Sequence, residues 1–273
     1  MTLESPVAMD ASSRFLKWNI QLLAGIVWLS AFIFGLYILA FYFIALLQGN
    51  TAQWNNILPG LYDAQTKTAT WSIGIHFAGG GLILILGCIQ LIDRFRKKHP
   101  SVHRWIGRVY ILASLATALG GLAFIFLKGT IGGTVMDIGF TGYGVLMFYA
   151  AVQTIRHARS RRFDQHRAWA LRLFALAIGS WLYRMDYGFW MLTMDGWGHS
   201  NNFQGPFDHF MSFWFYLPNL LVAEIIIRRQ NWLTTPISKW MASGGLFLCI
   251  AFFILATFFF TKHYWGPAIV GLW

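Results

Sequence analysis

The amino-acid sequence predicts an all-α integral membrane protein, a bundle of seven transmembrane helices with the N-terminus inside and the C-terminus outside. Two observations support this fold class. The 273 residues are 57% hydrophobic and only 11% charged, whereas a soluble domain is about a quarter charged. Apolar stretches of roughly 20 residues, the length that spans a bilayer, recur along the chain. This composition excludes an ordinary soluble enzyme, a disordered protein and a disulfide-rich secreted module.

Each apolar stretch is expected to be a helix, because backbone polar groups in lipid must be satisfied within the segment. The first stretch is too long for a signal-peptide core and is interpreted as a retained helix. The last stretch and the first are apolar nearly all round and are expected to lie at the periphery. The expected spans are 20–47, 71–93, 105–127, 137–156, 168–192, 208–228 and 240–261.

The domain organisation follows from these spans. Residues 1–19 form a cytoplasmic N-terminal segment and 20–47 the first transmembrane helix. Residues 70–232 form the central bundle of helices two to six, and 233–273 form the last helix and an outer tail. The loops between these helices leave no room for a separate soluble domain.

The positions of lysine and arginine set the expected orientation. Of the 21 basic residues, 17 fall at the helix ends that share one side of the membrane, in groups near residues 14–17, 94–108, 156–172 and 228–239. The positive-inside rule places this side, and the N-terminus, in the cytoplasm. The protein is therefore expected in the inner (plasma) membrane. The net charge of +11 is interpreted as a topology signal beside the lipid bilayer, with no nucleic-acid partner.

A weak internal repeat relates two helical hairpins, 71–127 and 137–192. Gln90 precedes His103 by 13 residues, and Gln153 precedes His166 by the same spacing. Each histidine is followed by arginine and opens a return helix, so the two imidazoles should occupy equivalent positions near the inner interface. The residues four positions on share a helix face with each histidine and are small, namely Gly107 and Ala170. They leave room for a neighbouring helix, a lipid headgroup, a quinone ring or a haem edge.

Polar and ionisable groups inside a membrane are costly and indicate functional sites by default. An inner layer of such groups surrounds the two histidines, and Glu224 in it is expected to pair with Arg172 or Arg108. The layer has two interpretations, a structural ion pair or a proton relay or headgroup site. Its members besides His103 and His166 include Gln90, Arg108, Arg172, Asn219 and Glu224.

An outer layer of polar groups lies nearer the opposite interface. It includes His76, Tyr143, Arg184, Asp186, Asp208 and His209. Arg184 and Asp186 are too close in sequence to face one another on a helix, so each is expected to pair across helices, with His76 or His209 as partners. The glycine run 79–81 after His76 permits close approach of a helix or a flat ligand. A buried polar cluster without a ligand is the alternative.

A b-type haem needs axial ligands, which are usually histidines on facing helices. His103 and His166 are the natural inner pair. At the outer side, Gly139 is the residue that the repeat makes equivalent to His76, and glycine cannot bind a metal. His209 is then the alternative outer ligand. The sequence therefore predicts His103, His166, His76 and His209 as cofactor-binding residues, without a symmetric two-haem arrangement; haem b and quinone remain open as the cofactor. No H-E-x-x-H motif occurs and no metal site is expected.

Four motifs between about residues 70 and 232 occur together in this chain. They are His76-Phe77-Ala78-Gly79 with Gln90, the run from His103 to Tyr110, His166-Arg167-Ala168-Trp169 with Arg172, and the run from Asn219 to Glu224. With these motifs the chain resembles a known family of bacterial membrane proteins, the domain of unknown function 2306. The resemblance implies a multi-helix inner-membrane protein. A looser likeness to di-haem cytochrome b electron carriers lies in helix number and in histidines on successive helices.

Three functional hypotheses follow. The first is a redox membrane protein that binds haem or quinone between the helices that begin near His103 and His166. The second is a transporter for a small solute or proton, based on the repeat and on charged groups such as Glu224 and Arg184. The third is a non-catalytic subunit or assembly factor with membrane partner subunits.

Overall fold

The computed structural model describes residues 10–57, 59–228 and 233–270, and within these ranges the chain is helical and contains no strand. The expected N-terminal segment and outer tail fall partly outside the described residues, as does Arg229 of the last basic group. The elements in chain order are α1 (Ala11–Ile38), η1 (Leu39–Phe43), α2 (Ile44–Leu47), η2 (Thr51–Asn56), α3 (Lys67–Gln90), α4 (Asp93–Lys98), α5 (Pro100–Lys128), α6 (Gly133–Arg159), α7 (Phe163–Ala177), α8 (Gly179–Met194), α9 (Pro206–Trp214), α10 (Leu217–Arg228), α11 (Pro236–Phe260), η3 (Thr261–Trp265) and α12 (Gly266–Val270).

Six helical stretches in the described residues are long and apolar enough to cross a membrane. They correspond to six of the seven expected spans. The first begins well before Ile20, because the Asp10 side chain accepts a hydrogen bond from the backbone N–H of Ser13 at 3.0 Å and caps the helix there. The six stretches are Ala11–Leu47, Lys67–Gln90, Pro100–Lys128, Gly133–Arg159, Pro206–Arg228 and Pro236–Val270.

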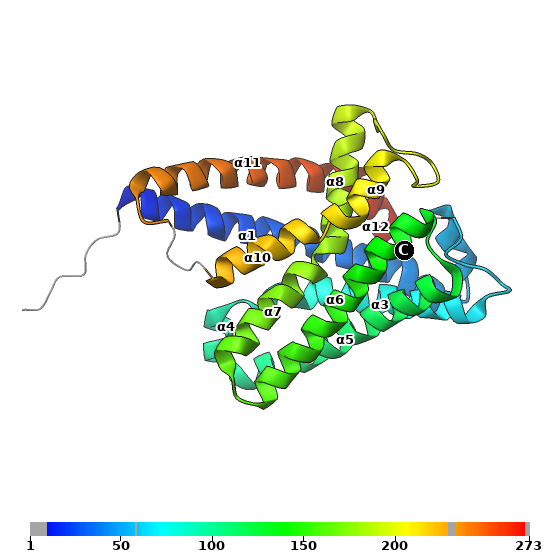
Figure 1. The fold of residues 1–273 in the computed structure, drawn as a ribbon, viewed down its shortest axis with the longest axis horizontal. Coiled ribbons are helices and arrows are strands. Elements are labelled where there is room, and N and C mark those ends of the chain that lie inside the picture. The colour runs from blue at the N-terminus through cyan, green and yellow to red at the C-terminus, as the bar shows by residue number, and fades with distance from the viewer. Residues whose placement is uncertain (1–9, 58, 229–232, 271–273) are drawn as a thin grey trace, which may run out of the picture.

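The remaining expected span, 168–192, is divided into two helices that meet at Ile178. Helix α7 has 15 residues and α8 has 16, so each is shorter than the roughly 20 residues that span a bilayer. Figure 1 shows α8 turning steeply away from the line of α7. This part of the chain is therefore a bent pair of helices rather than one straight span.

The break between α7 and α8 lies against a second break, between α9 and α10. A Cβ atom added at Gly179 would lie 3.3 Å from the carbonyl oxygen of Phe215, the residue that follows α9. Side chains bond the carbonyls at both breaks: the Tyr143 hydroxyl donates to Leu176 O at 2.9 Å and the Asn219 amide donates to Phe215 O at 2.8 Å. Because lipid offers no hydrogen bonds, these contacts stabilise the interruptions. Asn219, predicted as a member of the inner polar cluster, acts here as a structural residue.

Helices α3 and α5 approach closely through small residues. A Cβ atom at Gly79 would lie 2.9 Å from the carbonyl oxygen of Ala113, and one at Gly120 would lie 2.5 Å from that of Ser72. Glycine is the residue that permits such backbone contact between membrane helices. The expected close approach at the glycine run is confirmed for Gly79 against α5 and for Gly81 against Leu39 and the backbone of Gly35.

Gly79 and Gly80 provide a matched pair for testing this packing. Gly79→Ala is expected to destabilise the protein by about 1–3 kcal/mol, the usual cost of overpacking, because its methyl group meets the α5 backbone. Gly80→Ala is the control, since nothing lies within 4 Å of its Cβ position, and it should stay within about 0.5 kcal/mol of the parent. Unfolding in a titration of denaturing detergent measures both. Equal losses for the two variants would contradict the packing described.

The expectation that the first and last helices lie at the periphery of the bundle holds for α11 but not for α1. Of the 18 most apolar consecutive residues in the last span, Pro236–Val270, 11% are buried. In the first span, Ala11–Leu47, the share is 33%, close to the 39% in the spans formed by α3, α5 and α6. Helix α1 packs on α3 and α11, and its Ser30 hydroxyl accepts a hydrogen bond from the Trp181 indole of α8 at 2.8 Å. The first helix is thus part of the core.

The helix ends that carry the basic groups lie on one side of the molecule. In Figure 1 the starts of α1 and α11, the end of α10, and the turns around α4 and before α7 all lie toward the left. Lys67 and Lys128, which begin α3 and end α5, lie at the other ends of those helices. The basic groups that cluster along the sequence therefore also gather on one side of the folded molecule.

Candidate functional site

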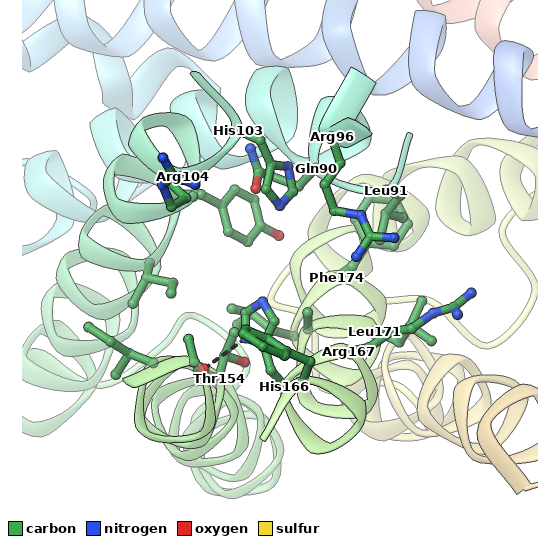
Figure 2. Close-up of a pocket in the computed structure, with 18 of the residues that line it drawn as sticks. Gln90, Leu91, Arg96, His103, Arg104, Thr154, His166, Arg167, Leu171 and Phe174 are labelled. Carbon is green, nitrogen blue, oxygen red and sulfur yellow. Dashed lines mark hydrogen bonds between the residues drawn. The ribbon is translucent and has the colours of Figure 1, made fainter. Parts of the chain in front are cut away.

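A cavity of about 800 Å³ opens at the basic end of the bundle, between the end of α3, α4, the start of α5, the end of α6 and the start of α7. His103 of α5 and His166 of α7 both line it, and so do Gly107 and Ala170. Figure 2 shows His103 and Gln90 on one wall and His166 and Thr154 on the opposite wall. The two histidines that the repeat relates therefore share one cavity.

The His166 ring is fixed by a hydrogen bond to the neighbouring helix. Its Nδ1 lies 2.9 Å from the carbonyl oxygen of Thr154 on α6. A carbonyl can only accept, so Nδ1 carries the proton and the neutral ring keeps a lone pair on Nε2. This arrangement gives His166 a defined orientation and a free nitrogen for a ligand.

The opposite wall carries polar atoms that have no partner in the protein. The Nδ1 atom of His103, the Nε2 atom of Gln90 and the hydroxyl of Tyr110 are buried without a hydrogen bond in the described structure. Tyr110 as a whole is 6% exposed. Buried polar groups are normally satisfied, so three unsatisfied groups in one cavity indicate a bound molecule or water.

The small residue beside His103 has a specific role in this wall. A Cβ atom at Gly107 would lie 3.1 Å from Oε1 of Gln90. The space expected beside the imidazole is thus partly filled by the Gln90 carboxamide, which comes from the end of α3. Gln90 was predicted as part of the inner polar cluster, and the structure places it between Gly107 and the cavity.

Arginines surround the exposed edge of the cavity. Arg96 donates to Asp93 at 3.0 Å and Arg104 donates to the Ser101 hydroxyl at 3.0 Å. In the described part of the chain, Arg96 is the one cavity-lining arginine that forms an ion pair; the ion pairs there include none of Arg104, Arg108, Arg159 and Arg167. Arg108, which was predicted as a site residue, belongs to this group. The arginines that line the cavity are Arg96, Arg104, Arg108, Arg159 and Arg167.

The predicted pairing of Glu224 with Arg172 is confirmed, and it lies outside the cavity. Glu224 accepts from Nε of Arg172 on one side and from Nε of Arg228 at 3.0 Å on the other. The Arg172 guanidinium also lies 4.5 Å from the centre of the Trp169 ring. This group ties α7 to α10, which supports the structural interpretation of an ion pair between helices.

The strength of this ion pair can be measured by a double-mutant cycle. Glu224→Gln is expected to lower the free energy of unfolding by about 1–3 kcal/mol, because the side chain of Arg172 is only 18% exposed and loses its counter-charge. In an Arg172→Met background the same change should cost much less. Detergent unfolding of the four proteins gives the coupling energy, and additive effects would exclude a direct interaction.

The outer residues are not joined into one site by hydrogen bonds or ion pairs in the described structure. The Nδ1 atom of His76 bonds to the carbonyl oxygen of Thr117 on α5 at 2.9 Å. Arg184 lies 5.1 Å from the Phe34 ring and donates to Ser180 O on its own helix at 3.3 Å. Among the described residues neither Arg184 nor Asp186 forms an ion pair with a histidine, so this expectation is wrong. Arg184 instead lies over an aromatic ring of α1.

His209, the other histidine predicted as an outer ligand, is also separate from His76, Arg184 and Asp186. His209 forms no hydrogen bond or ion pair with His76, Arg184 or Asp186 among the described residues. The repeat partner of His76, Gly139, contacts α9, since a Cβ atom there would lie 2.4 Å from the Ser212 carbonyl oxygen. A larger side chain has no room at this position, so the second hairpin lacks an outer ligand for a steric reason.

Sequence reasoning placed Asp208 among the outer polar groups but missed the network that it forms at the start of α9. The Asp208 side chain is fully buried and accepts from the Tyr187 hydroxyl at 2.7 Å and from the backbone N–H of Ser200 and of Gly205 at 3.0 and 2.9 Å. His199 Nδ1 lies 2.6 Å from the same carboxylate. The group caps α9 and holds the loop 195–205 against it. No periodic pattern marks His199, which stands alone in a glycine-rich loop.

Metal binding by clustered side chains has no support in the described part of the chain, where no group of three or more His, Cys, Asp or Glu lies close enough to hold an ion. His99 and His103 are four residues apart in sequence. His99 is the residue before the first turn of α5 rather than part of the helix, and it does not line the cavity.

The fold defines a multi-helix membrane protein with a cavity between its helices at the basic end. Comparison with known families gives a more specific assignment. The chain belongs to the family described as "Predicted membrane protein (DUF2306)", whose model matches residues 73–227. This range holds α3 to α10 apart from their outermost residues, and therefore the whole cavity. No curated protein and no solved structure matches the chain.

Proposed function

We propose that this chain is a redox-type membrane protein that binds a b-type haem in the inner cavity, with His103 and His166 as the two axial ligands. The observation that carries this proposal is the pair of imidazoles, from α5 and α7, on opposite walls of one cavity. Such pairs on facing helices hold b-type haems, and the haem supplies one-electron transfer when bound. The cavity volume of about 800 Å³ falls in the range of cofactor pockets, roughly 300–1,000 Å³.

The surroundings of the two rings support ligation. Ligating histidines usually donate their second N–H to a carbonyl or carboxylate, which fixes the ring and raises its basicity. His166 has this bond to Thr154. For His103, the Gln90 carboxamide lies against Gly107, one helical turn along α5 from His103, and a turn of this amide would supply the acceptor. Gln90 is therefore proposed as the positioning residue for His103.

A visible spectrum tests the proposal. Protein purified after growth with ample haem precursor is expected to give a reduced-minus-oxidised difference spectrum of b-type haem, with about one haem per chain. A flat difference spectrum from well-folded protein would contradict haem binding.

A quinone is the second candidate, and the unpartnered donors favour it. The Tyr110 hydroxyl and Gln90 Nε2 are buried without acceptors, and a quinone carbonyl accepts from such groups. The Nε2 lone pair of His166 on the opposite wall would accept from a quinol hydroxyl. Solvent extraction of the purified protein distinguishes the two cofactors: quinone retained with a flat visible spectrum supports this candidate, and haem without quinone excludes it.

We further propose the orientation that the basic groups indicate. The N-terminus and the cavity would face the cytoplasm, with α7 and α8 together forming the seventh crossing of the inner membrane and the C-terminus outside. The common side of the basic helix ends supports this orientation. A redox group in the cavity would then lie near the cytoplasmic face.

Cysteine labelling tests the orientation. In a background without Cys88 and Cys249, Asn201→Cys in the outer loop is expected to react with a membrane-impermeant maleimide on cells whose outer barrier is opened. Ser160→Cys, in the turn before α7, should react only after the inner membrane is disrupted. Both positions are exposed. The reverse pattern would place the cavity on the outer face.

A further inference from the structure

The exposed edge of the cavity is strongly basic. It is formed by the arginines named above, here called the rim arginines: Arg96, Arg104, Arg108, Arg159 and Arg167. Two carboxylates, Asp93 and Asp164, share this edge, so five positive and two negative groups leave it about three charges positive. Figure 2 shows Arg96, Arg104 and Arg167 around the cavity. The rim attracts an anion.

We propose that the rim arginines bind the head group of an anionic phospholipid. This site goes beyond the proposed redox function, because the rim arginines are exposed whereas His103, His166 and Tyr110 lie deeper, half-buried or buried. Basic pockets between membrane helices on the cytoplasmic side are suited to phosphate head groups, since guanidinium groups form paired hydrogen bonds with phosphate oxygens.

The backbone adds to the attraction. Helices α5 and α7, of 29 and 15 residues, both begin at the rim, with Pro100 and Phe163 lining it, and neither N-terminus is capped by a side chain. The first turn of a helix presents free N–H groups and a partial positive charge. Two helix starts and a set of arginines therefore face the same opening, and together they favour a group with several anionic oxygens.

Apolar side chains beside the arginines indicate that the anion belongs to a lipid. Phe163 and Leu91 line the cavity and are 66% and 40% exposed. Trp105, one residue after Arg104, is 66% exposed. A soluble phosphate or a nucleic-acid backbone would leave these aromatic and aliphatic side chains exposed to water, whereas the acyl chains of a phospholipid would cover them.

Native mass spectrometry of the full chain tests this proposal. Protein reconstituted with equal amounts of phosphatidylcholine and phosphatidylglycerol and then extracted into detergent is expected to retain phosphatidylglycerol preferentially. The variant Arg104→Gln/Arg167→Gln should lose about thirtyfold in affinity, since each arginine near an anionic surface contributes about 1 kcal/mol. The control is Arg94→Gln/Arg162→Gln, which removes the same charge from the same two turns at exposed positions that do not line the cavity.

Three results would overturn the proposal. They are equal retention of the two lipids, equal loss in the rim and control variants, and equal protection of the protein from heat by inorganic phosphate and by phosphatidylglycerol. Haem per chain is measured on the same samples. Loss of haem with unchanged lipid retention in the rim variant would assign the arginines to the carboxylates of the haem, and so separates failure of this inference from failure of the redox function.

Discussion

Replacing either His166 or His103 by alanine is expected to remove most of the bound haem. In the proposed site each imidazole supplies one axial ligand, and His166 is held for this role by Thr154. Loss of an outer-shell partner alone usually lowers metal affinity by about 10–100-fold, so loss of a ligand should leave each variant with about a tenth or less of the haem per chain. Visible absorbance at matched protein concentration measures the loss.

The controls for this prediction are the histidines outside the cavity. His209→Ala and His99→Ala should retain the haem content and the spectrum of the parent, because neither residue lines the cavity. A His103→Ala or His166→Ala protein with full haem content would contradict the pairing. Loss of haem in all four variants, with lowered thermal stability, would indicate a general folding defect instead.

Asp208→Ala is expected to have the largest effect on stability, about 3–5 kcal/mol. The change leaves the Tyr187 hydroxyl, His199 and two backbone N–H groups without their acceptor, and each buried unsatisfied group costs about 1–3 kcal/mol. It also removes a cap from α9. Unfolding in denaturing detergent measures the loss, and protease cleavage in the loop 195–205 should rise in parallel.

Two variants define the specificity of this effect. Asp164→Ala removes an exposed carboxylate and should change the stability by less than about 0.5 kcal/mol. His199→Ala removes one of the partners and should cost only part of the Asp208→Ala loss. An Asp208→Ala protein as stable as its parent would mean that the network does not hold the loop.

The sequence predicts that His103 and His166 lie at the same end of the bundle, because both follow a repeat, and the structure places both in one cavity. Gln90 and His103 recur as Gln153 and His166 with the same spacing, and helices in equivalent hairpins bring their first turns to one end of the bundle. Burial cost also makes ion pairs predictable: Glu224 near the inner end of one helix required a nearby cation, and Arg172 is that cation.

Features that depend on irregular backbone could not be predicted in this way. The sequence signal near Ile178 is weak, because the pair Gly179-Ser180 follows it but no proline stands there and apolar residues continue on both sides. The break depends on partners distant in sequence, such as Tyr143. Likewise, Arg184 was expected to pair with His76 or His209, but it lies over the ring of Phe34. Phe34 comes from α1, and the uniform apolar pattern of that helix did not reveal that it belongs to the core.

The central claim is that His103 and His166 hold one redox group between them, and electron paramagnetic resonance of the oxidised protein tests it most directly. Two imidazole ligands fill both axial positions of a haem iron, so the account predicts a low-spin, six-coordinate signal that exogenous cyanide does not readily displace. In His103→Ala and His166→Ala protein the residual haem should become high-spin. A five-coordinate signal in the parent protein, or no haem signal at all, would contradict the claim.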